Sequence, residues 1–505
     1  MSGTILTIMP IIFPVISGLL LFIFGNKITA KQRDFTVALA LGINTVLTFL
    51  SFTGKGGELV LFYLNSSLSV GFSTDGVGMV YTGILAVMWL VVGVYSFEYI
   101  EGKGHGEEGG RELSPHIFYG FYLLVMGVMT GVGFSKDLVS FYMFYEFMTL
   151  LSVPLVIHTM TKEAVFAAKK YLFYSIGGAS MALFGFAVIY AASKGNVGFV
   201  PGGIFEGQIP AGYETILPVA VFLAILGFGT KAGMFPMHGW LTSAHPVAPA
   251  PASAVLSGVI VKTGVLGIIR VVFYIAGADL VRGSWVQYAF LVISLITVFM
   301  GSMLAYYERI FKKRLAYSTV SQVSYILFGI ATLNPVAFTG AMLHMVFHAV
   351  LKCGLFMNAG AVIHKTGVTT VDALRGIGKR MPKTFITFTI FSLGLIGIPP
   401  VCGFVSKWFL CVGALNEELG AFSYVGPAIL MVSALLTAGY LFGIVIKAFF
   451  PGEDFKVSEE GEAVPADPGK GMLISMGFLA IAAVLMGIFP SAFVHFFETI
   501  AQGIF

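Results

Sequence analysis

The sequence predicts an all-α, polytopic membrane protein with about 14 transmembrane helices. Hydrophobic residues make up 57% of the 505 residues and charged residues only 11%, whereas a soluble domain carries about 25% charged residues. The apolar residues lie in repeated runs of about 20, the length that an α-helix needs to cross a bilayer. Gly is abundant, with 62 residues, which suits closely packed membrane helices. This composition excludes a soluble fold, and no basic tract or zinc-ligand spacing indicates nucleic-acid binding.

Fourteen apolar segments follow one another along the chain. They are 4–24, 35–53, 77–97, 115–134, 138–158, 164–192, 214–242, 249–276, 285–307, 314–333, 336–363, 384–415, 423–450 and 470–497. The longest polar connections, 98–114, 193–213 and 451–469, are too short for a separate domain. The first segment has no basic flank, so we expect a membrane span and not a cleaved signal peptide. Residues 1–113 then supply three N-terminal spans, and 470–505 supply one C-terminal span.

Basic residues are distributed unevenly between the connections. The connections after odd-numbered spans, with their near flanks, hold twenty Lys and Arg residues, and those after even-numbered spans hold four. These four are Lys55, Lys136, Lys194 and Arg282. Because Lys and Arg accumulate on the cytoplasmic side of membrane proteins, we expect the odd connections in the cytoplasm. Both termini then lie outside the plasma membrane of a prokaryotic cell.

Apart from basic residues counted with the near flanks of the connections, and Glu214 at the first position of its span, six charged residues fall inside the expected spans. They are Glu146, Lys231, Lys262, Arg270, Lys352 and Lys407. Arg270 stands near the outer end of its span, so we expect it to extend to the interface. Each of the other five costs roughly 2.5–3.5 kcal/mol on insertion, or roughly 12–17 kcal/mol together. A structural pairing could explain one Glu–Lys pair, but it leaves an excess of Lys, which favours a working pathway for charge.

The eleventh span carries three titratable residues on one face. His344, His348 and Lys352 are spaced i, i+4 and i+8, so they project from the same side of a helix. His titrates near neutral pH, and a line of such groups can pass protons if water bridges them. A metal pair is the rival interpretation, but the zincin motif requires Glu after the first His and Met345 stands there. An ordinary core histidine remains an alternative for either one alone.

The seventh span contains a charge and a helix breaker close together. Pro236 removes a backbone donor five residues after Lys231, and four nearby glycines loosen the same region. We expect a discontinuous helix, which membranes tolerate only where it lines a wet or protein-buried cavity. Lys231 would stand at the end of the first half, where the helix dipole favours a cation. His238 and His245, which flank the following turn, are weaker candidates for the pathway.

The same combination recurs five spans later. Pro399 and Pro400 break the twelfth span and Lys407 follows, although the order of lysine and proline is reversed. Because five is odd, the two copies must be inverted relative to each other, as in many transporters. We therefore expect two inverted five-helix repeats, 114–276 and 285–450, with broken helices at about 214–242 and 384–415.

Other chemistry is not indicated. Cys353, Cys402 and Cys411 lie in apolar segments without the spacing of an iron–sulfur site. No GxSxG or HExxH sequence is present. We expect no catalytic residue, no metal site and no cofactor in this chain.

Three stretches carry a resemblance to a known family. TKAGMFPMHGWLTSAHPVAPAPASAVLSGVIVKTGVLGIIR, KKRLAYSTVSQVSYILFGI and HMVFHAVLKCGLF resemble the antiporter-like proton-pumping subunits of respiratory complex I. They are also similar to subunits of Mrp sodium/proton antiporters and of energy-converting membrane-bound hydrogenases. The resemblance covers roughly 70–450. A Lys at position 407, where one complex I branch uses Glu, favours the Mrp D-like or hydrogenase H-like branch.

The resemblance implies roles for individual residues. Glu146 matches the family's key glutamate, Lys231 the lysine paired with it, Lys262 the connecting lysine and Lys407 the terminal group. The remaining matches are His344, His348 and Lys352 in the eleventh span and Asp137 at the start of the fifth. The expected mechanism begins when Glu146 is drawn away from Lys231, so that a proton passes along the file to Lys407.

The resemblance also implies partners. It predicts other membrane subunits, homologous antiporter-like subunits and a peripheral redox arm, with lipid around the complex. An independent secondary transporter for a small solute, a membrane enzyme and a structural anchor are the alternatives. The residues leave open the coupling ion (protons alone, or sodium exchanged for protons), the energy source and the complex to which the chain belongs.

Overall fold

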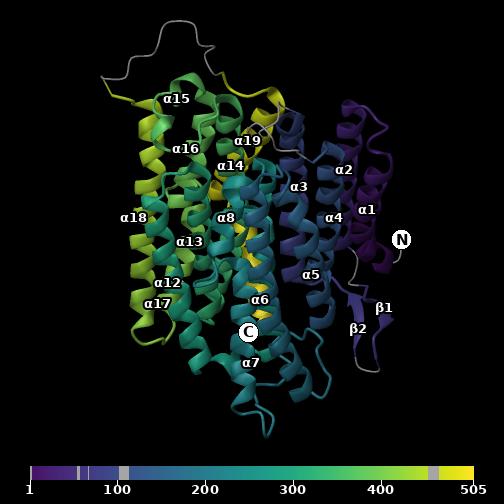
Figure 1. The fold of residues 1–505 in the computed structure, drawn as a ribbon. Coiled ribbons are helices and arrows are strands. Elements are labelled where there is room, and N and C mark those ends of the chain that lie inside the picture. The colour runs from purple at the N-terminus through teal and green to yellow at the C-terminus, as the bar shows by residue number, and fades with distance from the viewer. Residues whose placement is uncertain (1–2, 54–56, 66–67, 102–112, 453–465) are drawn as a thin grey trace, which may run out of the picture.

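A computed structural model describes the chain except residues 1–2, 54–56, 66–67, 102–112 and 453–465. The described residues form a bundle of membrane-crossing helices (Figure 1), so the expected fold class is confirmed. Eleven of the described helices are long and apolar enough to cross a membrane. The broken α7–α8 and α16–α17 spans and α13, which carries three basic residues in its first turn, account for the rest of the fourteen expected spans.

The N-terminal helices and a small hairpin precede the rest of the bundle. Their bounds are α1 Gly3–Phe24, α2 Ala30–Thr53, β1 Leu59–Tyr63, β2 Ser69–Phe72 and α3 Gly76–Glu101. The two strands pair antiparallel, from Leu59 opposite Phe72 to Tyr63 opposite Ser69. This hairpin fills the second connection and was not anticipated from the helical pattern of the sequence.

The first group of five spans contains the first broken helix. Its elements are α4 Pro115–Phe134, α5 Leu138–Val156, α6 Lys162–Ala192, α7 Ile216–Ala232, α8 Gly239–Val247, α9 Ala250–Val255, η1 Leu256–Ile260, α10 Val261–Ile269 and η2 Arg270–Ala276. The last four form one span, in which η1 and η2 are π-helical. The sequence predicted a single helix there. The short α11 Ala278–Val281 follows.

The second group contains the second break. Its elements are α12 Trp285–Tyr307, α13 Phe311–Ala331, α14 Pro335–Thr366, η3 Asp372–Leu374, α15 Ile377–Arg380, α16 Pro382–Ile396, α17 Gly403–Leu415 and α18 Phe422–Phe449. The chain ends with α19 Lys470–Ile488 and α20 Ser491–Ile504. The expected last span, 470–497, is therefore interrupted between these two helices, next to Pro490.

Both expected breaks are confirmed, and both begin at a glycine. Gly233 and Gly397 adopt left-handed backbone angles, with φ of 79° and 97°, which end a helix readily only at glycine. A proline stands three residues after each, at Pro236 and Pro400. In the first break, the Trp240 indole donates to the carbonyl of residue 230 at 2.7 Å and satisfies a carbonyl at the end of α7.

The most buried spans lie at the centre of the bundle. Every residue in the most apolar window of the α9–η2 span is buried, as are 89% of those in the corresponding windows of α4 and α14, against 33% for α1, α2, α6 and α19. A span that is buried on all sides contacts protein rather than lipid. The central spans α10 and α14 carry Lys262, His344, His348 and Lys352.

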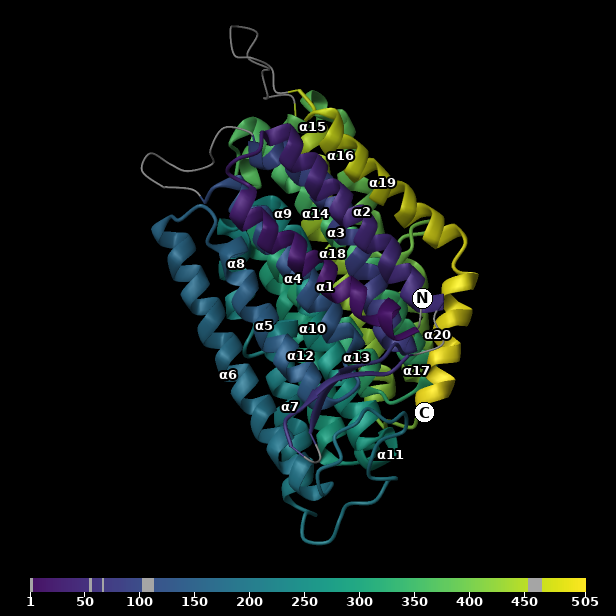
Figure 2. The same cartoon turned by 90° about the vertical axis from the view of Figure 1, so that its right-hand side faces the viewer.

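Successive connections lie at opposite ends of the bundle. α15, which belongs to an odd connection, lies at the top of Figure 1, and the β1–β2 hairpin lies toward the bottom. The short α11, in an even connection, lies toward the bottom of Figure 2. The chain is a multi-pass membrane protein, and this alternation is what repeated crossing requires.

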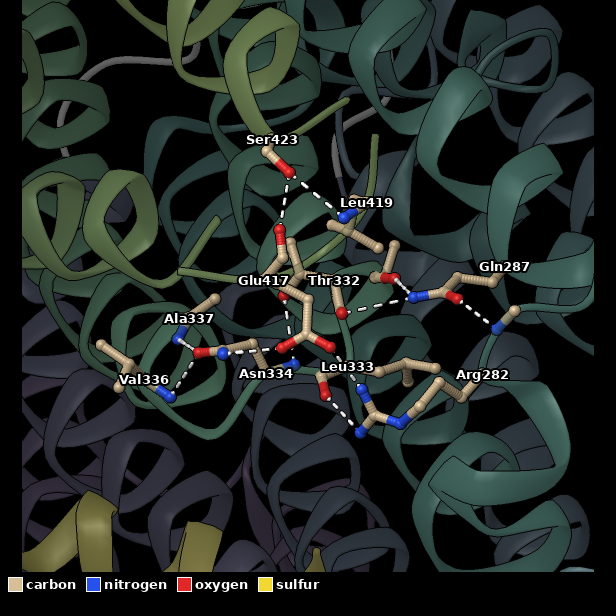
Figure 3. A network of polar contacts seen from close by, with 12 residues as sticks. Arg282, Gln287, Thr332, Leu333, Asn334, Val336, Ala337, Glu417, Leu419 and Ser423 are labelled. Atoms are coloured by element: carbon tan, nitrogen blue, oxygen red, sulfur yellow. Dashed lines mark hydrogen bonds and ion pairs between the residues drawn. The ribbon is translucent and has the colours of Figure 1, made fainter. Parts of the chain in front are cut away.

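A polar network joins three even connections, the one that precedes α12 and the two within the second group (Figure 3). Glu417 accepts from Arg282 at 2.5 Å and from the Asn334 amide at 2.9 Å. Asn334 in turn accepts from the first amides of α14 and caps that helix. The ends of α11, α13 and α17 are therefore joined to the start of α14.

Candidate functional site

Lys231 lies in the last turn of α7 and is only 1% exposed. Its ammonium donates to the hydroxyls of Thr149 at 2.9 Å, Tyr171 at 3.0 Å and Ser175 at 3.1 Å. The ring of Tyr171 also lies 4.5 Å from the nitrogen, a favourable cation–π distance. The position at a helix C-terminus favours positive charge, so neutral groups and a helix dipole hold this cation.

Glu146 does not contact Lys231 in this structure. It lies on α5 one turn before Thr149, and its Oε1 has no hydrogen-bond partner. Among the described residues, no carboxylate forms an ion pair with Lys231. The expected ion pair is therefore not formed in this structure, and Lys231 donates to the hydroxyl of Thr149.

Two further candidates lie at the edges of the first group. Asp137 precedes α5 and caps it, accepting from the Ser140 amide and hydroxyl, both at 2.8 Å. His238 precedes α8, stacks on Phe235 at 6.1 Å, and has no partner at Nδ1. Neither residue contacts Lys231 or Lys262. Asp137 has a clear structural role as the N-cap of α5, and the pathway role expected for both residues stays a prediction.

Lys262 connects the two groups of helices. Its ammonium donates to the carbonyl of Ser257 at 2.9 Å and lies 2.7 Å from Nδ1 of His348. Ser257 belongs to the π-helical turn η1, and such turns, in which the hydrogen-bond ladder changes register, are frequent at functional sites. The α9–η2 span and α14 are thus joined through an amine–imidazole contact within the protein core.

The three residues that the spacing places on one face of α14 are buried in the core. His344, His348 and Lys352 are each at most 1% exposed. Nδ1 of His344 lies 2.9 Å from the Ser406 hydroxyl on α17, and the two imidazole rings are 6.0 Å apart. Lys352 donates to the Leu315 carbonyl at 3.0 Å and to the Ser318 hydroxyl. The file therefore runs from α10 through α14 to α13 and α17.

Lys407 lies beside the second break. Its ammonium donates to the carbonyls of Leu395 at 2.7 Å and Ile396 at 2.9 Å, the last two residues of α16. The ring of Tyr325 lies 4.9 Å from the same nitrogen. Lys407 is therefore a side-chain cap for the helix that ends at the break. Its neighbour Ser406 carries the contact to His344.

The expected residues follow one another through the core in the expected order, but they do not form one continuous chain of direct contacts. Lys262 and His348 touch directly, and His344 reaches the residue before Lys407. No direct contact joins Lys231 to Lys262. Nε2 of His344 and Nε2 of His348 have no partner among the described residues. A buried polar nitrogen without a partner is costly, so these atoms are sites where water or a moving proton would be stabilised.

The hydroxyl groups that contact the buried amines and the His344 imidazole were not indicated by the sequence. Thr149, Tyr171, Ser175, Ser318 and Ser406 come from four helices other than those that carry their partners. Only their presence on otherwise apolar spans could have indicated them. The partner of Arg270 was not indicated either: the side chain is 1% exposed and pairs with Asp75, just before α3.

The fold and the site define a class: polytopic membrane proteins with two interrupted spans and a central file of buried amines and imidazoles. The family model described as NADH:quinone oxidoreductase/Mrp antiporter, TM matches residues 135–437. The chain belongs to this family, and the expected resemblance is confirmed.

Two curated relatives belong to two different kinds of complex. The NADH-quinone oxidoreductase subunit N of Desulforudis audaxviator is 32% identical over 419 residues, which cover 80% of this chain and 79% of the relative. The D-type subunit of the Na⁺/H⁺ antiporter of Alkalihalophilus pseudofirmus is 27% identical over 485 residues, which cover 94% of each.

Solved structures show the same fold. A chain of the membrane-bound sulfane sulfur reductase, an archaeal respiratory membrane complex, superposes with a TM-score of 0.84 at 21% identity, over 99% of this chain and 97% of the other. A chain of the Mrp complex from Dietzia sp. gives 0.83 at 22% identity over the same shares.

Proposed function

We propose that this chain moves protons across a prokaryotic plasma membrane as one ion-translocating subunit of a multisubunit complex. The observation that carries this proposal is the file of basic groups held by neutral partners, which reaches from the buried Lys231 to the half-buried Lys407. Such residues in a membrane core are costly and mark ion pathways. Relatives named as quinone oxidoreductase and sodium/proton antiporter subunits support the same conclusion.

The partners follow from the relatives. The two superposed chains belong to multisubunit membrane complexes, so we expect other membrane subunits beside this one, including homologous antiporter-like chains. A peripheral redox arm, the division into repeats 114–276 and 285–450, and the orientation with both termini outside are parts of this proposal.

The chemistry is a relay between groups that gain and lose a proton. When Glu146 approaches Lys231, the carboxylate stabilises the ammonium, and when it withdraws, the cation depends on hydroxyl groups alone. The ammonium then releases a proton toward Lys262, which becomes charged while Lys231 becomes a neutral amine. His348 and His344 carry the proton on to Lys407, and Asp137 and His238 are candidates for access at the edges.

The experiment measures transport in vesicles that contain the native complex, purified through a tag on this chain. Lys231→Ala and Glu146→Gln are expected to lower proton transport at least tenfold while the complex still assembles. Lys365→Ala, at an exposed position on the C-terminal turn of α14, is the matched control and is expected to behave as the wild type. Full transport by both core variants would reject the proposal.

A further inference from the structure

Arg270 is a buried charge that lies outside the proposed relay. It begins the π-helical turn η2, about two helical turns after Lys262 in the same span, and it is 1% exposed. The spacing i, i+4 and i+8 places Lys262, Leu266 and Arg270 on one face of the helix, over about 12 Å. Arg inside a membrane costs about 2.5–3.5 kcal/mol, so this position calls for an explanation.

A polar cavity of about 410 Å³ lies among three of the even connections, and we call it the even-face cavity. Its walls are Glu58, Ser69 and Ser73 in the second connection, Lys136 and Asp137 in the fourth, and residues 195–199 in the sixth. The Glu58 side chain is 63% exposed, so the cavity opens to water on this face. Two carboxylates against one ammonium give the cavity a negative balance that attracts cations.

Arg270 lies directly behind one wall of this cavity. Its guanidinium carbon is 4.7 Å from the ring centroid of Phe199, which lines the cavity, and 4.6 Å from that of Tyr274. Both distances are within the range of cation–π contacts. Along its span, Arg270 therefore lies between the even-face cavity and Lys262.

Asp75 holds the guanidinium in one position. Both terminal nitrogens of Arg270 donate to its carboxylate, Nη2 to Oδ1 at 2.8 Å, and the Gly78 amide donates to the same oxygen at 2.9 Å. A Cβ at Gly78 would lie 2.8 Å from this oxygen and 2.3 Å from the carbonyl oxygen of Gly133, so only glycine fits here. A bidentate, charge-assisted pair of this kind fixes the geometry of the guanidinium.

The chemistry of arginine suits a barrier and not a relay. A guanidinium has only donors and keeps its proton, so it cannot take a proton on one side and release it on the other. The Asp75 side chain is 30% exposed and water screens its charge, whereas the buried guanidinium is screened much less. A net positive potential remains, which repels protons and sodium ions, as a pore-lining Arg does in channels.

We infer that Arg270 is a fixed-charge barrier that separates Lys262 from the even-face cavity, and that Asp75, Phe199 and Tyr274 are positioning residues for it. Without the barrier, a proton in the cavity would pass directly to Lys262 and bypass the steps that begin at Lys231. The inference rests on the proposed function, because a barrier has a role only where Lys262 exchanges protons.

The first test measures the passive proton leak of the native complex in vesicles without an energy source. Arg270→Met with Asp75→Leu replaces the ion pair by apolar side chains, a change that is often neutral for the stability of buried pairs. An imposed pH gradient, followed with a trapped pH-sensitive dye under a potassium clamp, is expected to decay at least tenfold faster than in the wild type. Arg282→Met with Glu417→Gln, which removes another ion pair of the even face, is the matched control and is expected to stay tight.

Arg270→Gln is a second variant that keeps a hydrogen-bond donor toward Asp75 but loses the charge. It is expected to leak in the same way, so the test does not depend on assembly of the double variant. Assembled Arg270 variants that are as tight as the wild type would overturn the inference.

Asp75→Asn distinguishes a barrier from a structural tie between helices. It leaves the buried guanidinium without its charged partner and lowers the stability, but it keeps the positive charge. A barrier predicts that Asp75→Asn stays tight while the more stable apolar double variant leaks. A structural tie predicts that the leak follows the loss in melting temperature, and that order would reject the inference.

Lys262→Met locates the path of the leak. Added to the Arg270→Met and Asp75→Leu changes, it is expected to restore tight vesicles, because the leaking proton has to bind the Lys262 amine. A leak that persists in this triple variant would mean that the substitutions open an unrelated path, and the inference would be wrong.

The outcomes separate this inference from the proposed function. If the Arg270 variants stay tight while Lys231→Ala abolishes driven transport, the barrier is wrong and the proposed function stands. If Lys231→Ala and Glu146→Gln both keep full transport, the proposed function is wrong and the inference falls with it, whatever the leak.

Discussion

Replacing Lys407 by Met distinguishes two effects of this side chain, its contribution to the stability of the second break and its expected part in proton transport. The ammonium makes two hydrogen bonds to carbonyls at the end of α16, at 2.7 and 2.9 Å. Hydrogen bonds to a charged group contribute about 1.5–3 kcal/mol each, so removing the amine forfeits roughly 3–6 kcal/mol. The methionine side chain keeps most of the apolar contacts of the lysine stem.

The loss is largely offset, because the charge itself is costly in the membrane. An ammonium at this depth costs about 2.5–3.5 kcal/mol on insertion, and Met removes that cost. The difference is a net destabilisation of about 0–3 kcal/mol, which corresponds to a decrease in the melting temperature of no more than a few degrees for a chain of this size. Transport, in contrast, is expected to fall at least tenfold because the last protonatable group of the file is gone.

The melting temperature of the purified complex is measured by thermal unfolding, with size-exclusion chromatography to monitor the intact complex. Transport is measured separately and expressed per assembled complex. Lys447→Met is the control, because Lys447 lies on α18 and pairs with the exposed Asp372 at 2.6 Å. A large drop in melting temperature with undiminished transport per complex would show that Lys407 is a structural clamp, and the reasoning would be refuted.

Three further predictions concern packing and ion pairs. Gly258→Ala is expected to lower assembly severely, because its Cβ would lie 2.2 Å from Sγ of Cys353. Gly177→Ala is the control, since its Cβ would meet nothing within 4 Å. Adding Cys353→Ala to Gly258→Ala should restore assembly, and a double variant that does not assemble would exclude this clash as the cause. Asp75→Asn is expected to cost about 2–3 kcal/mol in thermal unfolding, below the ~3–5 kcal/mol of a fully buried pair, because the carboxylate is 30% exposed; an unchanged melting temperature would contradict it. Glu417→Gln is expected to lower the stability by under about 1 kcal/mol, because the ion pair with Arg282 is exposed. Glu417→Ala is expected to cost roughly 1 kcal/mol more, because the hydrogen bonds are lost as well. If both variants melt at the same temperature as the wild type, the network in Figure 3 does not stabilise the connections.

The spans and their breaks were readable in the sequence because they depend on local chemistry. Apolar runs give the helices, and the breaks follow from backbone groups that proline and glycine remove or release. Proline alone is a poor signal, however. α1 continues through Pro10 and Pro14, α5 through Pro154 and α18 through Pro427.

The better signal is a glycine three residues before a proline. Gly233 and Gly397 both take left-handed angles at the end of the first half-helix, followed by Pro236 and Pro400. The glycine ends the helix by its own conformation, and the proline prevents the following residues from resuming it. The same spacing in both halves is a local feature, visible in the sequence without reference to lysine.

The partners of the buried charges could not be predicted, because they come from distant parts of the chain. Arg270 pairs with Asp75, which lies 195 residues earlier. Lys231 depends on hydroxyls from α5 and α6. Helical periodicity states which face a residue occupies but not which helix it meets. The π-helical turn η1, whose Ser257 carbonyl accepts from Lys262, was missed for the same reason, since it packs against the distant α14.

The two breaks place their lysines in one electrostatic setting despite the opposite order of lysine and proline in the sequence. Lys231 belongs to the half-helix that ends at the first break and lies in its last turn. Lys407 follows the second break, but its side chain returns to the last carbonyls of the preceding half-helix. Both ammonium groups therefore lie at a helix C-terminus, where unsatisfied carbonyls and the dipole favour a cation. The break supplies the negative potential that a carboxylate would otherwise provide. Under the proposed function, each lysine would hold its proton without a permanent acidic partner and release it when that balance changes.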